Sequence, residues 1–473
     1  MLNRDGESKR EQIDFHSIED LMPEDHILRK IDKAIDFSFI YDLVSGCYCP
    51  DNGRPSIDPV VLFKIVFIQY LFGISSMRKT IREIKVNIAY RWFLGYGLRD
   101  SIPHFTTFGK NYVRRFSNTD IFERIFSRIL EEGIKCGYVS PESVFIDSTH
   151  IKANANRNKT LKKEVEIKAK EYHSELMCEI NRDRKANGKK AFKDKDDGDS
   201  GTPTKTITGS RTDPESGMFH KGEHERCFAY SAHTACDKNN FILGVEISPG
   251  NIHDSLMFST LYEKIIGNFP EAKNIVVDAG YKTPYICMKV LEDNRTPVMP
   301  YKRVPTRKGM FRSREFYYDR EGDFFTCPAG HILKYGTTNR DGYREYKSQR
   351  KLCRNCPHLE KCTQSKNCQK VVTRHVWAPY VDKVDQIRLT PYGKEIYAKR
   401  SQTIERVFAD AKERHGLRYT TLRGKAKVKM KVLLTFACMN LKKIANWKAK
   451  DPRYSGQKPF FHFLFPSFIN ITA

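Results

Sequence analysis

The chain has 473 residues, 40% of them hydrophobic and 12% aromatic, which is enough for two or three domains with buried cores. Lys and Arg number 82 against 57 Asp and Glu, and the formal net charge of +25 favours a polyanionic partner such as nucleic acid. The sequence has neither a run of about 18 apolar residues nor an apolar signal core near its start, which argues against a membrane span or secretion and predicts a soluble, cytoplasmic protein.

Residues 1–135 are predicted to form an all-helical region. Apolar residues recur at helical spacing between Val60 and Phe72, and Ser75-Ser76 are expected to cap the helix that follows. Residues 88–94 predict a third helix, and Thr106 or Thr107 would cap a fourth. Short helices joined by tight turns are typical of a helix-turn-helix.

The second of these helices has a basic face. Arg78, Lys79 and Arg82 lie on it, and we predict that they contact DNA. An ordinary solvated surface is the alternative, because basic faces on helical bundles are common.

Residues 157–212 are rich in charge and poor in apolar side chains, which predicts a protruding helix leading into a mobile linker. The next segments, 227–236 and 241–247, predict a β-hairpin with its turn at 237–240. Two short apolar strands, 143–147 and 274–278, each end in an aspartate.

Two carboxyl-terminal segments have helical patterns, Tyr392–His415 and Lys425–Trp447. In the second, apolar residues recur at four-residue steps and predict a buried seam. Residues 451–473 are expected to form a tail.

The two strand-end aspartates, Asp147 and Asp278, are candidate metal ligands. An ionised carboxylate at the end of a buried strand needs a partner, and two of them in a basic chain favour a shared Mg²⁺. For either residue alone, a turn cap is the simpler interpretation. Glu405 is the candidate third ligand, with Lys412 two helical turns further along the same side. A surface glutamate on an amphipathic helix is the alternative for Glu405.

Four blocks carry a family resemblance. They read FIDSTHIKANAN, GNIHDS, VVDAGYKTP and YAKRSQTIERVFADAK. In this order they resemble the catalytic blocks of the DDE transposases of bacterial insertion sequences. The resemblance implies that Asp147, Asp278 and Glu405 are the catalytic, metal-binding triad.

The last block is similar to the Tyr-Arg-Glu-Lys signature of one branch of that family. Tyr397, Arg400, Glu405 and Lys412 occupy its positions, and the resemblance implies that Tyr397, Arg400 and Lys412 bind DNA. Four residues separate Arg400 from Glu405, where the usual pattern has three.

The resemblance implies an α/β fold, a ribonuclease H-like mixed sheet flanked by helices. The catalytic domain would comprise 136–320, with its charged linker at 157–212, and 376–450, which adds the catalytic and last helices. It also implies two Mg²⁺ (or Mn²⁺) ions that assist cleavage and strand transfer. The expected partner is double-stranded DNA, both the terminal inverted repeats and the target. A second copy of the chain is expected to form a homodimer in the DNA complex, associated with the nucleoid.

Residues 321–375 form a predicted cysteine-rich insertion. Its thiols have the spacing of a zinc ribbon rather than of a disulfide framework. The predicted ligands of one structural Zn²⁺ are Cys327, Cys353, Cys356, Cys362 and Cys368. Reduced cysteines without metal are the alternative.

Other readings remain open. His150 and the pair His253-Asp254 lie near the expected site, although hydrogen-bonded structural roles are simpler for both histidines. A metal-dependent site-specific nuclease, or a domesticated protein that only binds DNA, would keep the fold without transposition. A zinc-dependent transcription regulator would leave the three carboxylates unexplained.

Overall fold

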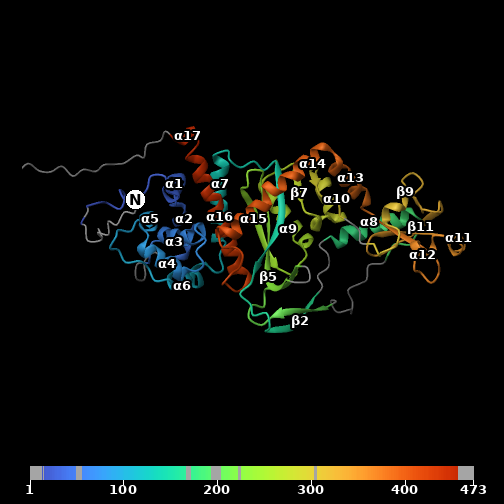
Figure 1. Cartoon of the computed structure of the whole chain (residues 1–473), viewed down its shortest axis with the longest axis horizontal. Coiled ribbons are helices and arrows are strands. Elements are labelled where there is room, and N and C mark those ends of the chain that lie inside the picture. The colour runs from blue at the N-terminus through green and yellow to red at the C-terminus, as the bar shows by residue number, and fades with distance from the viewer. Residues whose placement is uncertain are drawn as a thin grey trace, which may run out of the picture. The chain divides into compact units, whose positions relative to one another are not determined.

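The computed structural model describes residues 13, 15–49, 56–166, 172–192, 204–221, 225–302 and 306–455. Contacts divide the chain into two compact units (Figure 1). The first, here the helical unit, comprises Met1–Tyr138, Arg414–Gly416 and Leu433–Ala473. The second, here the sheet unit, comprises Val139–Glu413 and Leu417–Val432. Among the described residues, no helix is long and apolar enough to cross a membrane.

The helical unit is built from helices, four of which lie where the sequence predicted them. The helices are α1 (Ile27–Ala34), α2 (Phe39–Val44), α3 (Pro59–Leu71), α4 (Met77–Val86), α5 (Ile88–Leu94), α6 (Thr106–Asn111), α7 (Ile121–Lys135), the end of α16 (Lys425–Lys448) and α17 (Pro452–Ser455). The Ser76 side chain accepts a hydrogen bond from Lys79 N and caps α4, as predicted. The predicted cap of α6 is wrong: Thr106 is the first helical residue, and its N–H donates to His104 Nδ1.

The core of the helical unit is built around α3. Most side chains of α3 are buried, and the ring of Phe63 packs against three other phenylalanines: Phe108, Phe116 and Phe122. In α16, whose residues are divided between the two units, the predicted seam is confirmed, because Val428, Val432, Phe436, Asn440 and Ile444 are all fully buried. The apolar residues of α3, interrupted only by Lys64 and Gln69, therefore mark an interior helix rather than an amphipathic surface one.

A six-stranded mixed sheet forms the centre of the sheet unit. Its strands are β1 (Ser143–Lys152), β4 (Gly217–Lys221), β5 (Glu225–Cys236), β6 (Ile242–Pro249), β7 (Asn274–Val277) and β8 (Thr296–Val298). β5 pairs antiparallel with β1, β4 and β6, whereas β1, β7 and β8 are parallel neighbours. The helices that pack on this sheet include α9 (Phe258–Asn268), α10 (Pro284–Glu292), α13 (Ala378–Leu389), α14 (Pro391–Ala398) and α15 (Ile404–Glu413).

The predicted hairpin is confirmed as β5 and β6. Asp237 closes its turn: its N–H donates to Phe241 O at 3.0 Å, and its carboxylate accepts from Phe241 N at 2.7 Å. Asn240 takes the positive φ of 64° that this turn requires.

The prediction for residues 157–212 is wrong in two respects. The segment begins with a strand, β2 (Thr160–Glu166), which pairs antiparallel with β3 (Thr204–Ser210). Its helix, α8 (His173–Ala186), does not protrude: Asp183 is 5% exposed and forms an ion pair with Arg344. The stretch 193–203, which was predicted to be mobile, lies outside the described residues.

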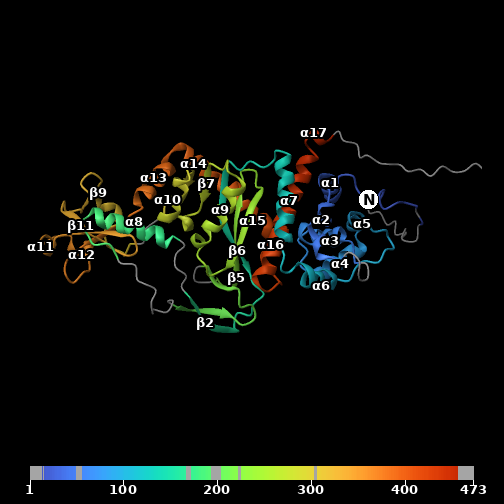
Figure 2. The same cartoon turned by 180° about the vertical axis from the view of Figure 1, so that it is seen from behind.

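The cysteine-rich segment supplies most strands of a second, five-stranded antiparallel sheet. Its strands follow the order β13 (Val371–His375), β12 (Tyr343–Lys347), β11 (Ile332–Thr338), β10 (Phe324–Thr326) and β9 (Tyr317–Asp319). Two short helices, α11 (Arg350–Arg354) and α12 (Leu359–Cys362), lie between β12 and β13. A small core joins Phe316, Phe325, Leu333 and Tyr346. α8 lies beside β11 when seen from either side (Figure 1 and Figure 2).

Candidate catalytic site

The two candidate aspartates lie side by side at the ends of adjacent parallel strands. In the register of β1 and β7, Ile146 is paired with Val277, so Asp147 and Asp278 are the next residues on each strand. Asp147 is still within β1, whereas Asp278 is the first residue beyond β7. Parallel pairing therefore brings together two carboxyl groups that are far apart in the sequence.

Arg400 connects these two carboxylates. Its Nη2 donates to Asp147 Oδ2, and its Nη1 lies 3.9 Å from Asp278 Oδ1. The Arg400 side chain is only 6% exposed, and its Nη1 has no hydrogen-bond partner. The site thus contains a buried cation with unused donor capacity, aimed between two carboxylates.

The position of Arg400 depends on a break in the predicted helix. Tyr392–His415 is not one helix: α14 ends at Ala398, a 3₁₀ turn runs over Lys399–Gln402, and α15 begins at Ile404. Arg400 lies within this turn. The local change of backbone therefore places Arg400 where its side chain reaches Asp147.

Burial dominates the electrostatics of Asp147. It raises the pKa of this carboxyl from the ordinary 3.8 to about 6, although Arg400 and the backbone N–H of Ser148 act in the opposite direction. The neighbouring Asp278 carboxylate adds to the rise. Asp147 is therefore more costly to ionise than an ordinary surface aspartate, and a bound cation would offset that cost.

Glu405 lies on the first turn of α15 and is exposed. Burial raises the pKa of the Tyr397 hydroxyl, and the Asp278, Asp147 and Glu405 carboxylates add to the rise, so all three act on one tyrosine. The Tyr397 ring also lies 5.7 Å from the Arg400 guanidinium. Tyr397 thus lies within electrostatic reach of the whole predicted triad.

The carboxylates offer oxygen ligands, which Mg²⁺ prefers, and Mg²⁺ needs only one or two of them when phosphates and water complete its shell. Asp147 and Asp278 fit that requirement. No group of three or more potential ligand side chains within the described ranges is arranged to hold a metal ion. The structure thus brings two carboxylates together, with Glu405 on the neighbouring helix.

A polar cluster lies beside the aspartates; the sequence pointed to Asp254 near the site but not to His233. His233 is 1% exposed; its Nε2 lies 2.8 Å from Ser248 Oγ, and its Nδ1 lies 3.4 Å from the Tyr281 hydroxyl and 3.7 Å from Asp254 Oδ1. Burial lowers the pKa of His233 to about 4, so it is neutral at physiological pH. Only the register, which pairs His233 with Ser148, reveals the cluster.

The two histidines considered from the sequence have structural contacts. His253 caps a 3₁₀ turn, Asp254–Leu256, by accepting a hydrogen bond from Ser255 N. The His150 ring stacks on Phe219 with 3.6 Å between ring centroids. These contacts favour the structural interpretation of both side chains.

The cysteine-rich segment forms a cavity of about 20 Å³. Its thiols and imidazoles come from Cys327, Cys353, Cys356, Cys362, His331 and His358, and Cys368 is not among the lining residues. Cys327 Sγ accepts a hydrogen bond from His331 N at 3.4 Å. All thirteen cysteines lie in described residues and are free thiols. Because no group of described side chains is arranged to hold a metal, the predicted zinc site is not supported.

Two family models match the chain. A transposase domain, DUF772, matches residues 16–114 in the helical unit. A transposase DDE domain matches residues 326–445, which include Arg400, Glu405 and most of the cysteine-rich segment but neither aspartate. No curated protein matches the sequence.

Together these matches support a DDE transposase, an enzyme that acts on DNA. The family implies the use of a divalent metal ion, typically Mg²⁺. The mixed α/β architecture of the sheet unit is consistent with a DDE nuclease fold.

Proposed function

We propose that the chain is the transposase of an insertion sequence, which cuts DNA at the ends of the element and joins those ends to a target. The observation that carries this proposal is the meeting of Asp147 and Asp278 on adjacent parallel strands, with Arg400 donating to one and lying close to the other. A mixed sheet of this topology, with Glu405 supplied by a later helix, supports a ribonuclease H-like catalytic domain of the Tyr-Arg-Glu-Lys branch.

Asp147, Asp278 and Glu405 would hold the divalent ions. When bound, such ions would lower the pKa of the attacking water or hydroxyl and stabilise charge on the leaving oxygen. Asp147 is ionised above its pKa of about 6, so its carboxylate is ready to bind a cation at neutral pH.

Arg400 and Tyr397 would orient the DNA. Ion binding by the aspartates would release Arg400 from neutralising them, and its unpaired Nη1 could then donate to a phosphate oxygen. The raised pKa of Tyr397 keeps its hydroxyl protonated and able to donate. Lys412 lies two turns beyond Glu405 on α15 and would bind a phosphate further along the same DNA strand.

The experiment compares carboxylate variants in Mg²⁺-dependent cleavage of DNA that carries the element's ends. Asp147→Asn, Asp278→Asn and Glu405→Gln should each lose cleavage by orders of magnitude and still bind DNA. Two carboxylates on the same helix, Asp410 and Glu413, provide the controls. Asp410→Asn and Glu413→Gln should lose little, and an inactive control beside an active Glu405→Gln would disprove the choice of third carboxylate.

A site-specific nuclease is the second candidate, because the same carboxylates would support hydrolysis alone. Strand joining distinguishes the two functions. Pre-cut ends with free 3′-hydroxyls should be joined to a target plasmid by the wild-type chain. Cleavage without any joining would favour the nuclease.

A transposase must hold two DNA ends, so the proposal includes a homodimer in the DNA complex at the nucleoid. The helical unit would bind the terminal repeats. Mass measurement of the complex with end DNA should give two chains, and a single chain per two ends would contradict this arrangement.

A further inference from the structure

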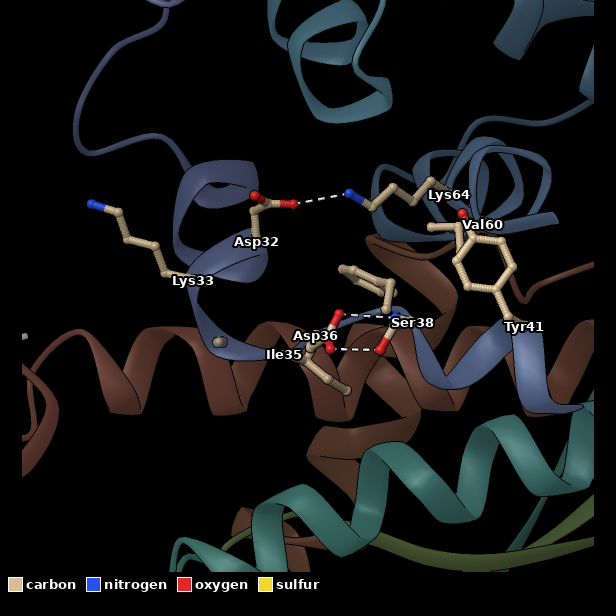
Figure 3. Close-up of a pocket in the computed structure, with 10 residues that line it drawn as sticks. Asp32, Lys33, Ile35, Asp36, Ser38, Tyr41, Val60 and Lys64 are labelled. Carbon is tan, nitrogen blue, oxygen red and sulfur yellow. Dashed lines mark hydrogen bonds and ion pairs between the residues drawn. The ribbon is translucent and has the colours of Figure 1, made fainter. Parts of the chain in front are cut away.

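The helical unit contains a cavity of about 450 Å³ whose two carboxylates, Asp32 and Asp36, are already engaged (Figure 3). Asp32 Oδ1 pairs with Lys64 Nζ at 2.9 Å, and Asp36 accepts hydrogen bonds from the backbone and hydroxyl of Ser38. These contacts fix the junction of α1, α2 and α3. We therefore assign no ligand to this cavity.

A second cavity in the same unit, of about 380 Å³, has a different charge. It lies between α4 and the segment 102–105, and it is lined by Arg78, Ile81, Arg82, Lys85, Ile102, Pro103, His104 and Phe105. Three of these side chains are cationic and none is acidic. Such a cavity attracts an anion.

The three cations lie on one face of α4. Arg78, Arg82 and Lys85 are separated by four and three residues, about one helical turn each, and all three are exposed. Within the described residues, none of them forms an ion pair with a carboxylate. Unpaired like charges at this spacing repel one another, and a bound polyanion would relieve that repulsion.

The opposite wall is apolar and held in place. The Phe105 ring lies 4.5 Å from the Arg78 guanidinium and 4.1 Å from the His104 ring. His104 Nδ1 is in turn 2.9 Å from Thr106 Oγ1, at the start of α6. Cations facing an apolar wall suit a ligand that alternates phosphate with a less polar sugar.

We propose that this cavity binds the sugar–phosphate backbone of one strand of duplex DNA. From Arg78 to Lys85 the helix rises about 10 Å, which corresponds to about three nucleotides at 3.4 Å per nucleotide on one strand. This length suffices for three phosphates, so the proposal assigns one phosphate contact to each cation. Phosphate contacts carry no base information, so the cavity holds DNA independently of sequence.

The inference rests on the proposed function, because DNA is the substrate in both. The sequence predicted DNA contacts for Arg78, Lys79 and Arg82 alike, whereas the cavity includes only the two arginines. Lys79 is exposed on α4 but does not line the cavity. It is therefore a matched control: the same helix and the same charge, outside the proposed contact.

The test measures the binding of the full chain to a random-sequence DNA duplex over a series of salt concentrations. Arg82→Ala should lower the slope of log affinity against log salt by about 0.9, the value for one lost phosphate contact. Lys79→Ala should keep the wild-type slope. A triple alanine variant of Arg78, Arg82 and Lys85 should lower the slope by about 2.7, and circular dichroism should show an unchanged fold.

Equal slopes for Arg82→Ala and Lys79→Ala would overturn the inference, because the cations would then act only through net charge. If the wild-type chain still cleaves end DNA in that case, the result refutes only DNA binding by the cavity and leaves the proposed function intact. A wild-type chain that binds no duplex at any salt concentration would overturn the inference and the proposed function together.

Discussion

Replacing Asp147 by asparagine should stabilise the fold at neutral pH while it abolishes cleavage. Asparagine has the shape of the protonated carboxyl but no charge, so it escapes the cost of ionising a buried group. The folded pKa of Asp147, about 6, lies above the ordinary value of 3.8. The folded chain therefore holds this proton more tightly than the unfolded chain does. The contribution of the group to stability is complete below about pH 4, and it is lost as the pH rises through 6.

The size of the effect follows from the pKa. One pKa unit is worth about 1.4 kcal/mol, so the rise from 3.8 to about 6 corresponds to about 3 kcal/mol. Because the Asp147 side chain is only 20% exposed, solvent screens little of this energy. The Arg400 guanidinium already opposes the rise, so this energy includes its attraction.

Urea denaturation of the wild type and of Asp147→Asn, at pH 8 and at pH 4.5, measures the effect. We expect the variant to be more stable by about 3 kcal/mol at pH 8, with most of that difference gone at pH 4.5. Asp278→Asn is the control, because the Asp278 side chain is 51% exposed and its loss should change stability little. If Asp147→Asn is less stable than the wild type at pH 8, its pairing with Arg400 outweighs burial and the reasoning is wrong.

Two further predictions concern the same arginine and a glycine in the helical unit. Arg400→Met removes the cation that lowers the pKa of Asp147. The pH at which Mg²⁺-dependent cleavage reaches half its maximum should therefore rise. An unchanged midpoint would show that Arg400 does not act on Asp147. Gly73→Ala should lower the free energy of unfolding by at least about 1 kcal/mol more than Gly95→Ala, the cost of forcing an extra carbon into a packed site. Both glycines have positive φ, but only a Cβ at Gly73 meets a backbone atom, the Arg414 carbonyl oxygen at 2.5 Å. Thermal unfolding compares the two variants, and equal melting temperatures would contradict the clash.

Much of the local structure follows from residues that are close in the sequence. The hairpin of β5 and β6, the caps of α3 and α4, and the stripe of α16 depend on turn residues, side-chain caps and periodicity. Each of these signals spans a few residues, so a single sequence contains it completely. The aspartates at the ends of two apolar strands belong to the same class of signal.

The surroundings of those aspartates were decided only by tertiary contacts. A 3₁₀ turn between α14 and α15 directs Arg400 towards Asp147, whereas the sequence pattern predicted one continuous helix. His233 and Tyr281 reach the site through strand pairing and burial. No periodic pattern marks any of these side chains.

The charged segment 157–212 likewise has features that the sequence determines and features that only tertiary contacts determine. By composition alone it looks like a solvated helix and linker, because charge is dense and apolar residues are few. In the folded chain β2 pairs with β3, and Asp183 of α8 is buried against Arg344 of the second sheet. Composition determined that this segment is charged. Only the partner Arg344, which is distant in the sequence, decided that one of those charges would be buried, because an ion pair needs both groups in place.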